Sequence, residues 1–528
     1  GKTQQIVFQS GLPKYDFAQQ IKSQEKVNPS YFEDITEATG LNYQHIENPF
    51  NEFDREPLIP YMTSAEGPAL AIADINGDGL EDVFVGASKS FHNAVYLQQT
   101  NGKFKPMPQP AMLQDSMWEN TDAIWADVNK DGATDLVIAS GGNEYYGEDA
   151  HLLPLLYLND GKGNLTRKVD AFAAIYTTQS KIVADDINGD GHIDLFIAGR
   201  VEPWKYGVAP RSYLLQNDGT GKFKDVTSTY STDLLNPGMI TDAQFVDINK
   251  DGTKDLLLSA AWGTIDVFIK SGNKYTKQTL LNQTGWWQSV TVTDMNEDGQ
   301  LDIIAGNFGL NSRLKASEQE PVTMYVNDFD NNGRAEQVIT YYLQGKEMPF
   351  ASKIQLEKSL PVLKKKFLYA EDFAKASLGQ LFDTEKLNKS LQLKATHFAN
   401  TILINKGKGK FEPIEMPSNA QLSNYRAVIP FKNQVQGQSY EQTQNQSAKV
   451  NSYLLLGNFG YNNIEIGKQD ADFGTVLKWN QQGSPTASTL NNIQISGEVR
   501  KAAPIKIGNL NCWILAKNNG ALQVLKLK

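Results

Sequence analysis

The stretch DINGDGLED (residues 74–82) decides the fold, because five near-copies of it follow along the chain. They are DVNKDGATD from 127, DINGDGHID from 186, DINKDGTKD from 247, DMNEDGQLD from 294 and DFDNNGRAE from 328. Each copy has acidic or amide side chains at positions 1, 3, 5 and 9, and glycine at position 6. The repetition indicates one local structure that is used six times.

The chemistry of the nonapeptide favours a calcium loop. Alternate oxygen-bearing side chains on a tight loop converge on one point, and glycine allows the positive φ of a sharp turn. The carbonyl at position 7 can also point inward. Hard oxygen ligands in this number suit Ca²⁺ better than Mg²⁺ or Zn²⁺. A single copy could be only an Asx-rich turn, whereas six copies with similar flanks predict five to six structural calcium ions.

The predicted metal ligands are the residues at positions 1, 3, 5, 7 and 9 of every copy, with position 7 acting through its carbonyl. They are Asp74, Asn76, Asp78, Leu80, Asp82, Asp127, Asn129, Asp131, Ala133, Asp135, Asp186, Asn188, Asp190, His192, Asp194, Asp247, Asn249, Asp251, Thr253, Asp255, Asp294, Asn296, Asp298, Gln300, Asp302, Asp328, Asp330, Asn332, Arg334 and Glu336.

The segments beside the loops predict strands. The first half of the motif matches an EF-hand loop, but an EF-hand needs glutamate at position 12 and helices on both sides. Here the flanks are short β-rich runs such as KIVADD before a loop and LFIAGR after it. Such runs, ending in glycine, are typical of strands. We therefore expect each loop to join two antiparallel strands.

The repeat unit is longer than the loop. Successive copies start 53, 59, 61, 47 and 34 residues apart. Within most units a glycine turn follows, as in LYLNDGKGNL (156–165), and such turns between alternating apolar strands predict hairpins. Four antiparallel strands at this period indicate a blade of a β-propeller. The predicted fold is therefore all-β: a propeller of four-stranded antiparallel blades, seven in number, with eight left open.

The ends of the chain suggest how the ring closes. The final run ALQVLKLK lacks a partner strand, and YFEDITEATG (31–40) resembles the outer-strand segment FKDVTSTYS (223–231). We expect the early segment to complete the last blade. The predicted domains are an N-terminal extension (1–29), the propeller (30–528) and a helical insertion within it (346–395), which is Lys- and Leu-rich with helical spacing.

These motifs resemble the FG-GAP (VCBS-type) repeat propellers, the group that includes the integrin α-subunit head. VGA at 85–87 and GNFG at 306–309 and 457–460 fit the name-giving motif loosely. The order of segments is similar to the second propeller of long Bacteroidota surface proteins, which carry an ASPIC/UnbV module upstream. GKTQQIVF at the start resembles the tail of that module, and the chain starts without Met or a signal-peptide pattern. The resemblance implies a processed or trimmed piece of a longer protein at the outer-membrane surface.

One unit departs from the pattern. Near 425–460 the polar run KNQVQGQSYEQTQNQSAK stands where a metal loop is expected, which predicts a blade without an ion.

Composition excludes several classes of protein. The chain has 528 residues and a formal net charge of −10, with no basic stripe, so we expect no nucleic-acid partner. No apolar run approaches the ~20 residues of a membrane helix, and we expect a chain that does not span a membrane. Cys512 is the single cysteine, which excludes an internal disulfide, and the five histidines are too scattered for a zinc site.

The loops on the face opposite the metal loops are rich in large side chains, which predicts a ligand-binding rim. Aromatic rings pack against sugar or peptide surfaces while polar neighbours take hydrogen bonds. The alternative is that these rings pack between blades. The predicted rim residues are Tyr145, Tyr146, Arg200, Trp204, Tyr206, Trp262, Trp286, Trp287, Phe308, Arg313, Phe459 and Tyr461.

The sequence favours a non-catalytic, calcium-stabilised recognition module at the cell surface, which binds a glycan or a protein. It has no GxSxG, Walker or Cys/His signature. Glu144, Glu148, Asp149 and Glu202 on the predicted rim keep a glycosidase or lyase as an alternative. A second alternative, suggested by the resemblance, is an accessory subunit of an outer-membrane nutrient-uptake complex. Extracellular placement fits calcium modules that work at ~10⁻⁴–10⁻³ M.

Overall fold

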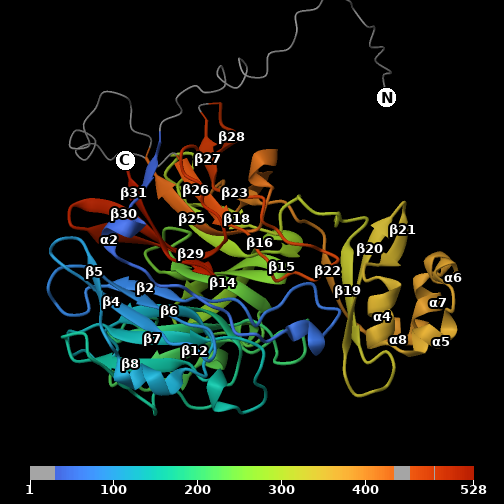
Figure 1. Ribbon diagram of the computed structural model, residues 1–528, viewed down its shortest axis with the longest axis horizontal. Helices are drawn as coiled ribbons and strands as arrows, with labels where there is room; N and C mark the ends of the chain where they lie inside the picture. The colour runs from blue at the N-terminus through green and yellow to red at the C-terminus, as the bar shows by residue number, and fades with distance from the viewer. Residues whose placement is uncertain (1–29, 433–451, 481) are drawn as a thin grey trace, which may run out of the picture.

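The computed structural model describes residues 30–432, 452–480 and 482–528. The predicted N-terminal extension (1–29) and nearly all of the polar run near 432–449 lie outside the described residues. Seven sheets form a ring and an eighth sheet lies beside it (Figure 1).

Blades 1 to 4 follow one another along the chain and share a hairpin-by-hairpin strand order. Blade 1 has β2 (Leu70–Ala73), β3 (Asp82–Val85), β4 (Ala94–Gln98) and β5 (Phe104–Pro106). Blade 2 has β6 (Asn120–Ala126), β7 (Asp135–Ser140), β8 (Leu155–Asn159) and β9 (Leu165–Arg167). Blade 3 has β10 (Gln179–Asp185), β11 (Asp194–Gly199), β12 (Tyr213–Asn217) and β13 (Phe223–Asp225). Blade 4 has β14 (Met239–Val246), β15 (Asp255–Ser271) and β16 (Lys274–Trp286).

Blade 4 has three strands in place of four, because β15 supplies both the second and the third strand of the blade. The Lys270 N–H bonds the Asp255 carboxylate at 2.9 Å, although these residues stand at opposite ends of β15. The chain therefore folds back on itself within β15, near Trp262, whose φ is +57°.

Blades 5 to 7 complete the ring. Blade 5 has β17 (Ser289–Thr293), β18 (Asp302–Gly306), β23 (Thr401–Asn405) and β24 (Phe411–Glu415). Blade 6 has β25 (Tyr425–Phe431), β26 (Ser452–Gly457), β27 (Thr475–Trp479) and β28 (Pro485–Thr489). Blade 7 has β29 (Glu498–Ile507), β30 (Leu510–Asn518), β31 (Gln523–Leu527) and the N-terminal strand β1 (Phe32–Asp34).

The ring is closed by both ends of the chain, as predicted. Strand β1 pairs antiparallel with β31, with Phe32 opposite Leu527, and the blue N-terminal segment lies beside the red strands in Figure 1. The innermost strands contact one another in one circle, in the order β2, β6, β10, β14, β17, β25, β29 and back to β2. The propeller prediction is confirmed, and the circle has seven blades.

Apolar packing between neighbouring blades holds the ring. Seven buried clusters each join two adjacent blades; the cluster between blades 1 and 2, for example, includes Phe84 and Tyr157. Alternating apolar side chains on each strand supply these clusters, because both faces of a blade are covered by its neighbours.

The eighth sheet is an insertion between β18 and β23 of blade 5. Its strand order is β21-β20-β19-β22. The strands are β19 (Val322–Asn327), β20 (Glu336–Leu343), β21 (Lys346–Pro349) and β22 (Leu391–Ala395). Five short helices lie between β21 and β22: α4 (Lys353–Ser359), α5 (Val362–Lys366), α6 (Ala370–Lys375), α7 (Leu378–Leu381) and α8 (Thr384–Lys389). The sixth acidic loop connects β19 to β20, which explains its short spacing of 34 residues from the fifth.

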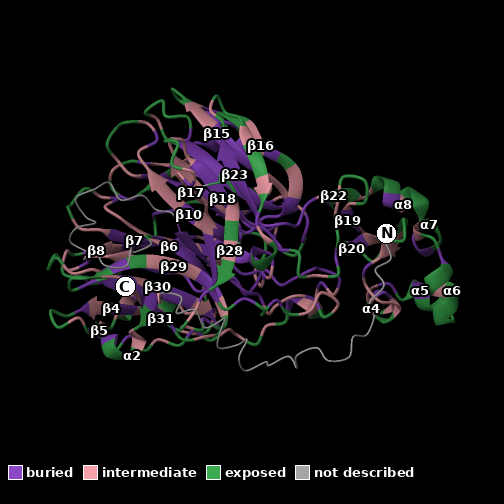
Figure 2. Ribbon diagram, turned by 90° about the horizontal axis from the view of Figure 1, so that it is seen from above, coloured by how far each residue is buried: buried purple, intermediate pink, exposed green. Residues whose placement is uncertain are grey.

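The insertion has its own core and is also packed on the ring. Leu356, Leu363 and Leu381 of the helices are buried with Val338 of β20. A second cluster joins β19, β20 and β22 to the ring face, and Figure 2 shows that α5 and α6 stay largely exposed at the far edge.

The remaining short helices are α2 (Thr36–Thr39), α3 (Thr227–Tyr230), η1 (Glu52–Asp54), η2 (Pro110–Asp115), η3 (Ala150–Leu152), η4 (Thr232–Leu234) and η5 (Ser418–Ala420).

Candidate metal loops and binding face

Five of the six acidic loops join the innermost strand of a ring blade to its second strand, in blades 1 to 5. The glycine at position 6 has φ between +79° and +89° in all six loops, which confirms the predicted turn. Position 4 is left-handed as well. In four copies a residue other than glycine stands there: Lys130 (φ +58°), Lys250 (+59°), Glu297 (+61°) and Asn331 (+63°). This was not predicted, because side chains other than glycine cost ~1–2 kcal/mol in this conformation.

The side chains at positions 1, 3 and 5 curl the loop around a common centre. In the first copy Asp74 accepts the N–H groups of Gly77 and Gly79, both at 2.8 Å. The Asn76 amide donates to the Asp78 carboxylate at 3.1 Å. The Leu80 N–H donates to the other oxygen of Asp78 at 2.9 Å. The bond from position 6 to position 1 recurs in the other five copies at 2.8–3.0 Å.

The aspartate at position 9 ties the loop to the blade. Asp135 accepts the Val128 N–H at 3.1 Å and the Asn159 N–H, from the third strand, at 2.9 Å. Asp82, Asp194 and Asp302 make the same pair of bonds. Position 9, at the start of the second strand, therefore links the acidic loop to the third strand of its blade, whether or not it also reaches a metal.

Negative charge accumulates in these loops. Burial, with a smaller contribution from the carboxylates at positions 1 and 5, raises the pKa of Asp82, Asp135, Asp194 and Asp255 to about 6. Backbone N–H donors oppose the shift only in part. A cation between the carboxylates would remove the repulsion.

The donor set fits calcium. The Oδ1 atoms of Asp127 and Asp294, both at position 1, are buried and have no hydrogen-bond partner. An orphaned carboxylate oxygen beside further carboxylate and amide oxygens is a ligand for a hard cation, and a flexible all-oxygen site suits Ca²⁺.

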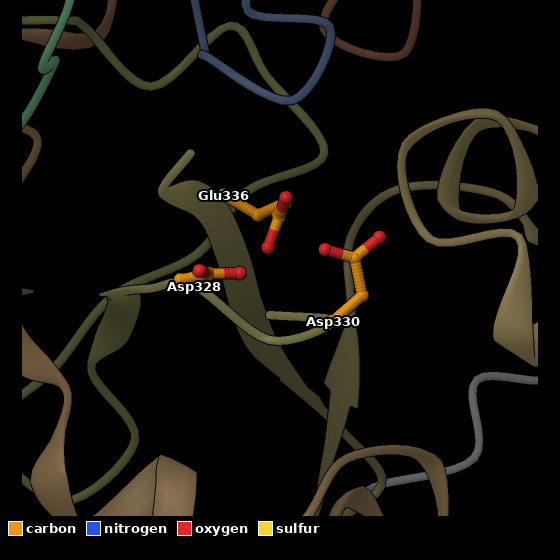
Figure 3. A group of neighbouring side chains, drawn as sticks. All are labelled: Asp328, Asp330 and Glu336. Carbon is orange, nitrogen blue, oxygen red and sulfur yellow. The ribbon is translucent and has the colours of Figure 1, made fainter. Parts of the chain in front are cut away.

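The sixth loop brings three carboxylates close together (Figure 3). Asp328, Asp330 and Glu336 each offer an oxygen, and these oxygens lie within 4.8 Å of one another. Burial raises the pKa of Glu336 to about 7, and Asp330 and Asp328 add to the shift. The Lys386 ammonium of α8 donates to the carbonyls of Asp328 (2.8 Å) and Phe329 (2.9 Å), so this loop is braced by a helix of the insertion.

One set of structural residues was missed by sequence reasoning. The Asn159 amide, at the end of the third strand of blade 2, donates to Ile75 O (2.8 Å) in the loop of blade 1 and to Thr134 O (3.0 Å) in its own loop. Asn217 repeats this bridge one blade further, to Val128 O and Ile193 O. The asparagine that recurs in LND (158–160), QND (216–218) and INK (404–406), always at the end of a third strand, could have predicted this bridge.

The predicted rim on the opposite face is largely wrong. Seven of its side chains are buried: Arg200, Tyr206, Trp262, Trp286, Trp287, Phe308 and Phe459. Trp286 packs against Trp262, Phe308 and Phe398, with centroids 4.8–5.0 Å apart, beneath Val322 and Met324 of the insertion. Trp287 lies between blades 4 and 5. The insertion covers this part of the ring face, and rings predicted to meet a ligand meet the protein instead.

Five predicted rim residues remain at least partly accessible. Tyr146 is 60% exposed and Trp204 is 42% exposed, whereas Tyr145 and Tyr461 are half-buried. Arg313 is exposed, pairs with Glu465 at 3.1 Å and lies 4.3 Å from the centre of the Phe350 ring.

Tyr145, Tyr146, His151 and Trp204 form an aromatic platform between the loops of blades 2 and 3. The rings of Tyr146 and Trp204 lie 4.0 Å apart. Tyr145 stacks on His151 at 4.2 Å with an interplanar angle of 15°. The platform is therefore two ring pairs on adjoining loops.

Trp204 is held in an unusual conformation. Its φ is +66°, a region that a bulky residue rarely occupies. The Trp204 N–H donates to Asn143 Oδ1 at 2.9 Å, its indole N–H donates to Glu144 O at 3.3 Å, and the Arg55 guanidinium lies 4.9 Å from its ring centre. A strained and fixed aromatic residue at the surface is a feature that points to a binding role.

Two of the four carboxylates considered for catalysis already have partners. Glu144 forms an ion pair with Lys89 and accepts the Asn48 amide. Asp149 caps η3 and bonds the His151 ring at 2.6 Å. Glu148 is exposed and Glu202 is half-buried.

Comparison with protein families points to the same repeat. Residues 74–138, 127–197, 186–258 and 247–305 each match the FG-GAP-like repeat. The ring carries FG-GAP-like repeats. Each match runs from one acidic loop into the strands that follow the next, so it spans parts of two neighbouring blades. No curated protein matches the chain.

Three of the solved structures that match the chain have TM-scores of 0.38 to 0.40. BBS1N in complex with ARL6DN is 9% identical, with 93% of this chain and 98% of that chain covered and a TM-score of 0.38. The Dos1 propeller is 10% identical, with 90% and 97% covered and a TM-score of 0.38. YCF48 bound to D1 peptide is 8% identical, with 92% and 97% covered and a TM-score of 0.40. Similarity at this level carries no inference about a ligand.

Within the described ranges, none of the helices has the length and apolar character needed to cross a membrane.

Proposed function

We propose that this chain is a non-catalytic recognition module, in which a calcium-stiffened ring presents the aromatic platform to a glycan. The observation that carries the proposal is Trp204: an exposed indole at φ +66°, fixed by two hydrogen bonds and paired with Tyr146. Such a ring is preorganised, so little conformational entropy is lost when a ligand stacks on it.

The platform suits the chemistry of a sugar. Flat aromatic faces pack against the C–H surface of a pyranose, while polar neighbours take its hydroxyls. Lys89, Glu144 and His151 lie among the rings as donors and acceptors. The paired carboxylates that a glycosidase would need have less support, because Glu144 and Asp149 are engaged in local bonds.

Calcium is proposed as the structural cofactor of the six acidic loops. The orphaned oxygens of Asp127 and Asp294 and the cluster of Asp328, Asp330 and Glu336 support it. The ion would hold three side chains of each loop in one arrangement and so stiffen the hairpin. Sites of this type fill at calcium concentrations found outside cells.

Placement at a bacterial cell surface is the finer part of the proposal. It rests on the calcium argument and on the resemblance to the second propeller of Bacteroidota ASPIC/UnbV-type surface proteins. In that setting the chain would serve recognition, or act as an accessory subunit of an outer-membrane uptake complex.

A glycan array tests the proposal. The purified chain, in calcium and in EDTA, is applied to the array together with the Trp204→Ala and Tyr146→Ala variants. We expect calcium-dependent binding to one sugar class and about 10–100-fold weaker binding by either variant, as for a central aromatic contact.

Tyr369→Ala is the matched control, because Tyr369 is also strongly exposed but lies on the insertion, away from the platform. Its glycan binding should equal that of the unchanged chain. If the folded, calcium-loaded chain binds no sugar, or if Trp204→Ala binds as well as the parent, the glycan proposal is wrong.

A second candidate function, protein docking, is favoured by the insertion. Its helical edge exposes Ile354, Val362, Leu368 and Tyr369, with exposed fractions of 53–74%. Apolar side chains that gather at one exposed edge are typical of an interaction site. Chemical crosslinking in cells, with Leu368→Lys as the comparison, would test it: a protein crosslinked to the parent but lost in the variant supports docking.

A further inference from the structure

The centre of the ring is a charged channel. The innermost strands of the blades line a cavity of about 590 Å³. Its wall carries five cationic side chains and only three carboxylates, Glu66, Asp122 and Asp242. A cavity of this size accommodates a small-molecule ligand.

A β-bulge recurs at the start of five inner strands and turns one side chain into this channel. The extra residue is Thr121 in β6, Ser180 in β10, Thr241 in β14, Arg426 in β25 and Arg500 in β29. All five line the cavity. A bulge re-aims a side chain without disturbing the rest of the strand.

The occupants of the bulge differ between the two halves of the ring. The Thr121 hydroxyl donates to Gln179 O (2.8 Å) and the Ser180 hydroxyl to Ile240 O (2.7 Å), each in the next blade. In blades 6 and 7 the bulge position carries Arg426 and Arg500 instead. A hydroxyl is enough for the bond to the next blade, so that bond does not account for the two guanidiniums.

The lysines of the channel are balanced by carboxylates. Asp122 lies 2.8 Å from the Lys501 ammonium and 3.6 Å from that of Lys181, and Lys181 lies 3.5 Å from Asp242. This part of the wall needs no further counter-ion.

The arginines are not balanced in the same way. Glu66 is held by Arg200 through two bonds of 2.9 Å. Arg426 lies 3.8 Å from Glu66, and its Nε is buried without a hydrogen-bond partner. Arg500 uses one nitrogen for Glu498 (2.8 Å) and Ala65 O (3.2 Å), and its Nε and Nη1 are buried without a partner.

Repulsion between these guanidiniums has a consequence for Arg426. Burial, together with Arg500 and Arg200, lowers the pKa of Arg426 to about 9. The Phe459 ring lies 5.1 Å from Arg426 and 4.5 Å from Arg500, and it belongs to the same buried cluster as Trp286. Unpartnered buried guanidinium donors are costly, and an oxyanion satisfies them through charge-assisted bonds.

We propose that Arg426 and Arg500 form a binding site for a small oxyanion, a carboxylate or a phosphate, inside the central channel. The site is independent of the aromatic platform and of the acidic loops. An oxyanion there would link Arg426 of blade 6 to Arg500 of blade 7 and offset the repulsion between the two guanidiniums.

Isothermal titration calorimetry tests the site with two probes, inorganic phosphate and succinate, at matched ionic strength. We expect one ion per chain for at least one probe, and which of the two binds distinguishes phosphate from carboxylate. Arg426→Gln should weaken that binding at least ~10-fold, since it removes charge-assisted hydrogen bonds. Arg313→Gln, which changes an exposed arginine outside the channel, should bind like the parent.

A second measurement does not depend on the variant folding. A crystal of the unchanged chain soaked in selenate should give an anomalous peak between Arg426 and Arg500. Absence of the peak together with absence of binding by either probe overturns the proposal, and so does an Arg426→Gln variant that is folded by circular dichroism and binds like the parent.

Discussion

The ring loops and the loop of the insertion carry the same nonapeptide in two different surroundings. In blades 1 to 3 and in blade 5, position 9 is an aspartate with one oxygen that accepts from the loop and another that accepts from the third strand. In the insertion, position 9 is Glu336, and a lysine of α8 braces the loop. The nonapeptide specifies the turn in both places. The contacts around it determine whether its loss would destabilise a ring blade or only the insertion.

Removal of calcium should have the largest effect on stability, and it should destabilise the ring, with five sites, more than the insertion, with one. At ~1 mM calcium and a dissociation constant of ~0.1 mM, one site stabilises by about 1.4 kcal/mol, so five ring sites give about 7 kcal/mol. Calorimetry in calcium and in EDTA measures the shift in Tm. Equal Tm values in the two conditions would contradict calcium stabilisation of the ring.

Trp286→Ala should break the contact between ring and insertion. Trp286 is fully buried and packs against four aromatic rings, so its loss should cost about 3–5 kcal/mol in the free energy of unfolding. Guanidinium unfolding measures the change, and limited proteolysis should show faster cleavage of the insertion. Trp204→Ala, at an exposed site, serves as the comparison; a similar cost for both would speak against the buried cluster.

Neutralising position 9 should distinguish the two kinds of loop. Asp135→Asn places an amide N–H₂ against one of two N–H donors and should cost about 2–3 kcal/mol. Glu336→Gln, which faces one such donor, should cost about 1 kcal/mol and affect mainly the insertion. Urea unfolding and hydrogen exchange of β19 and β20 report the two effects. Equal costs would remove the distinction between the regions.

Asn159→Ala should cost about 2 kcal/mol in the free energy of unfolding, because it leaves Ile75 O and Thr134 O without their donor. Asn164→Ala is the control, because this exposed asparagine lies in the same hairpin but bonds only Asp160. Urea unfolding of both variants shows whether the inter-blade bridge matters; a negligible cost for Asn159→Ala would show that it does not.

Local patterns made the ring predictable. The glycine at position 6, the strand runs beside the loops and the partner of ALQVLKLK follow from short stretches of sequence, and the structure agrees on each. The left-handed Lys130 and Lys250 were not predictable, because only the closed loop forces that conformation on a lysine.

Long-range packing made the opposite face unpredictable. Trp262 and Trp286 look like rim residues when only their own loops are considered. Their burial depends on Val322 and Met324, which belong to a sheet that the sequence reasoning did not recognise as an insertion. The predicted helices at 346–395 are a part of that unit, whose strands begin at Val322.

The pairing of β1 with β31 sets an order on folding. Lys526 and Glu33 form an ion pair across 493 residues of chain, at 3.1 Å. During synthesis on a ribosome, blade 7 cannot acquire its outer strand until the last residues of β31 have emerged. The other blades can each form as they appear, but closure of the circle waits for β31, and β1 stays without its partner strand until then.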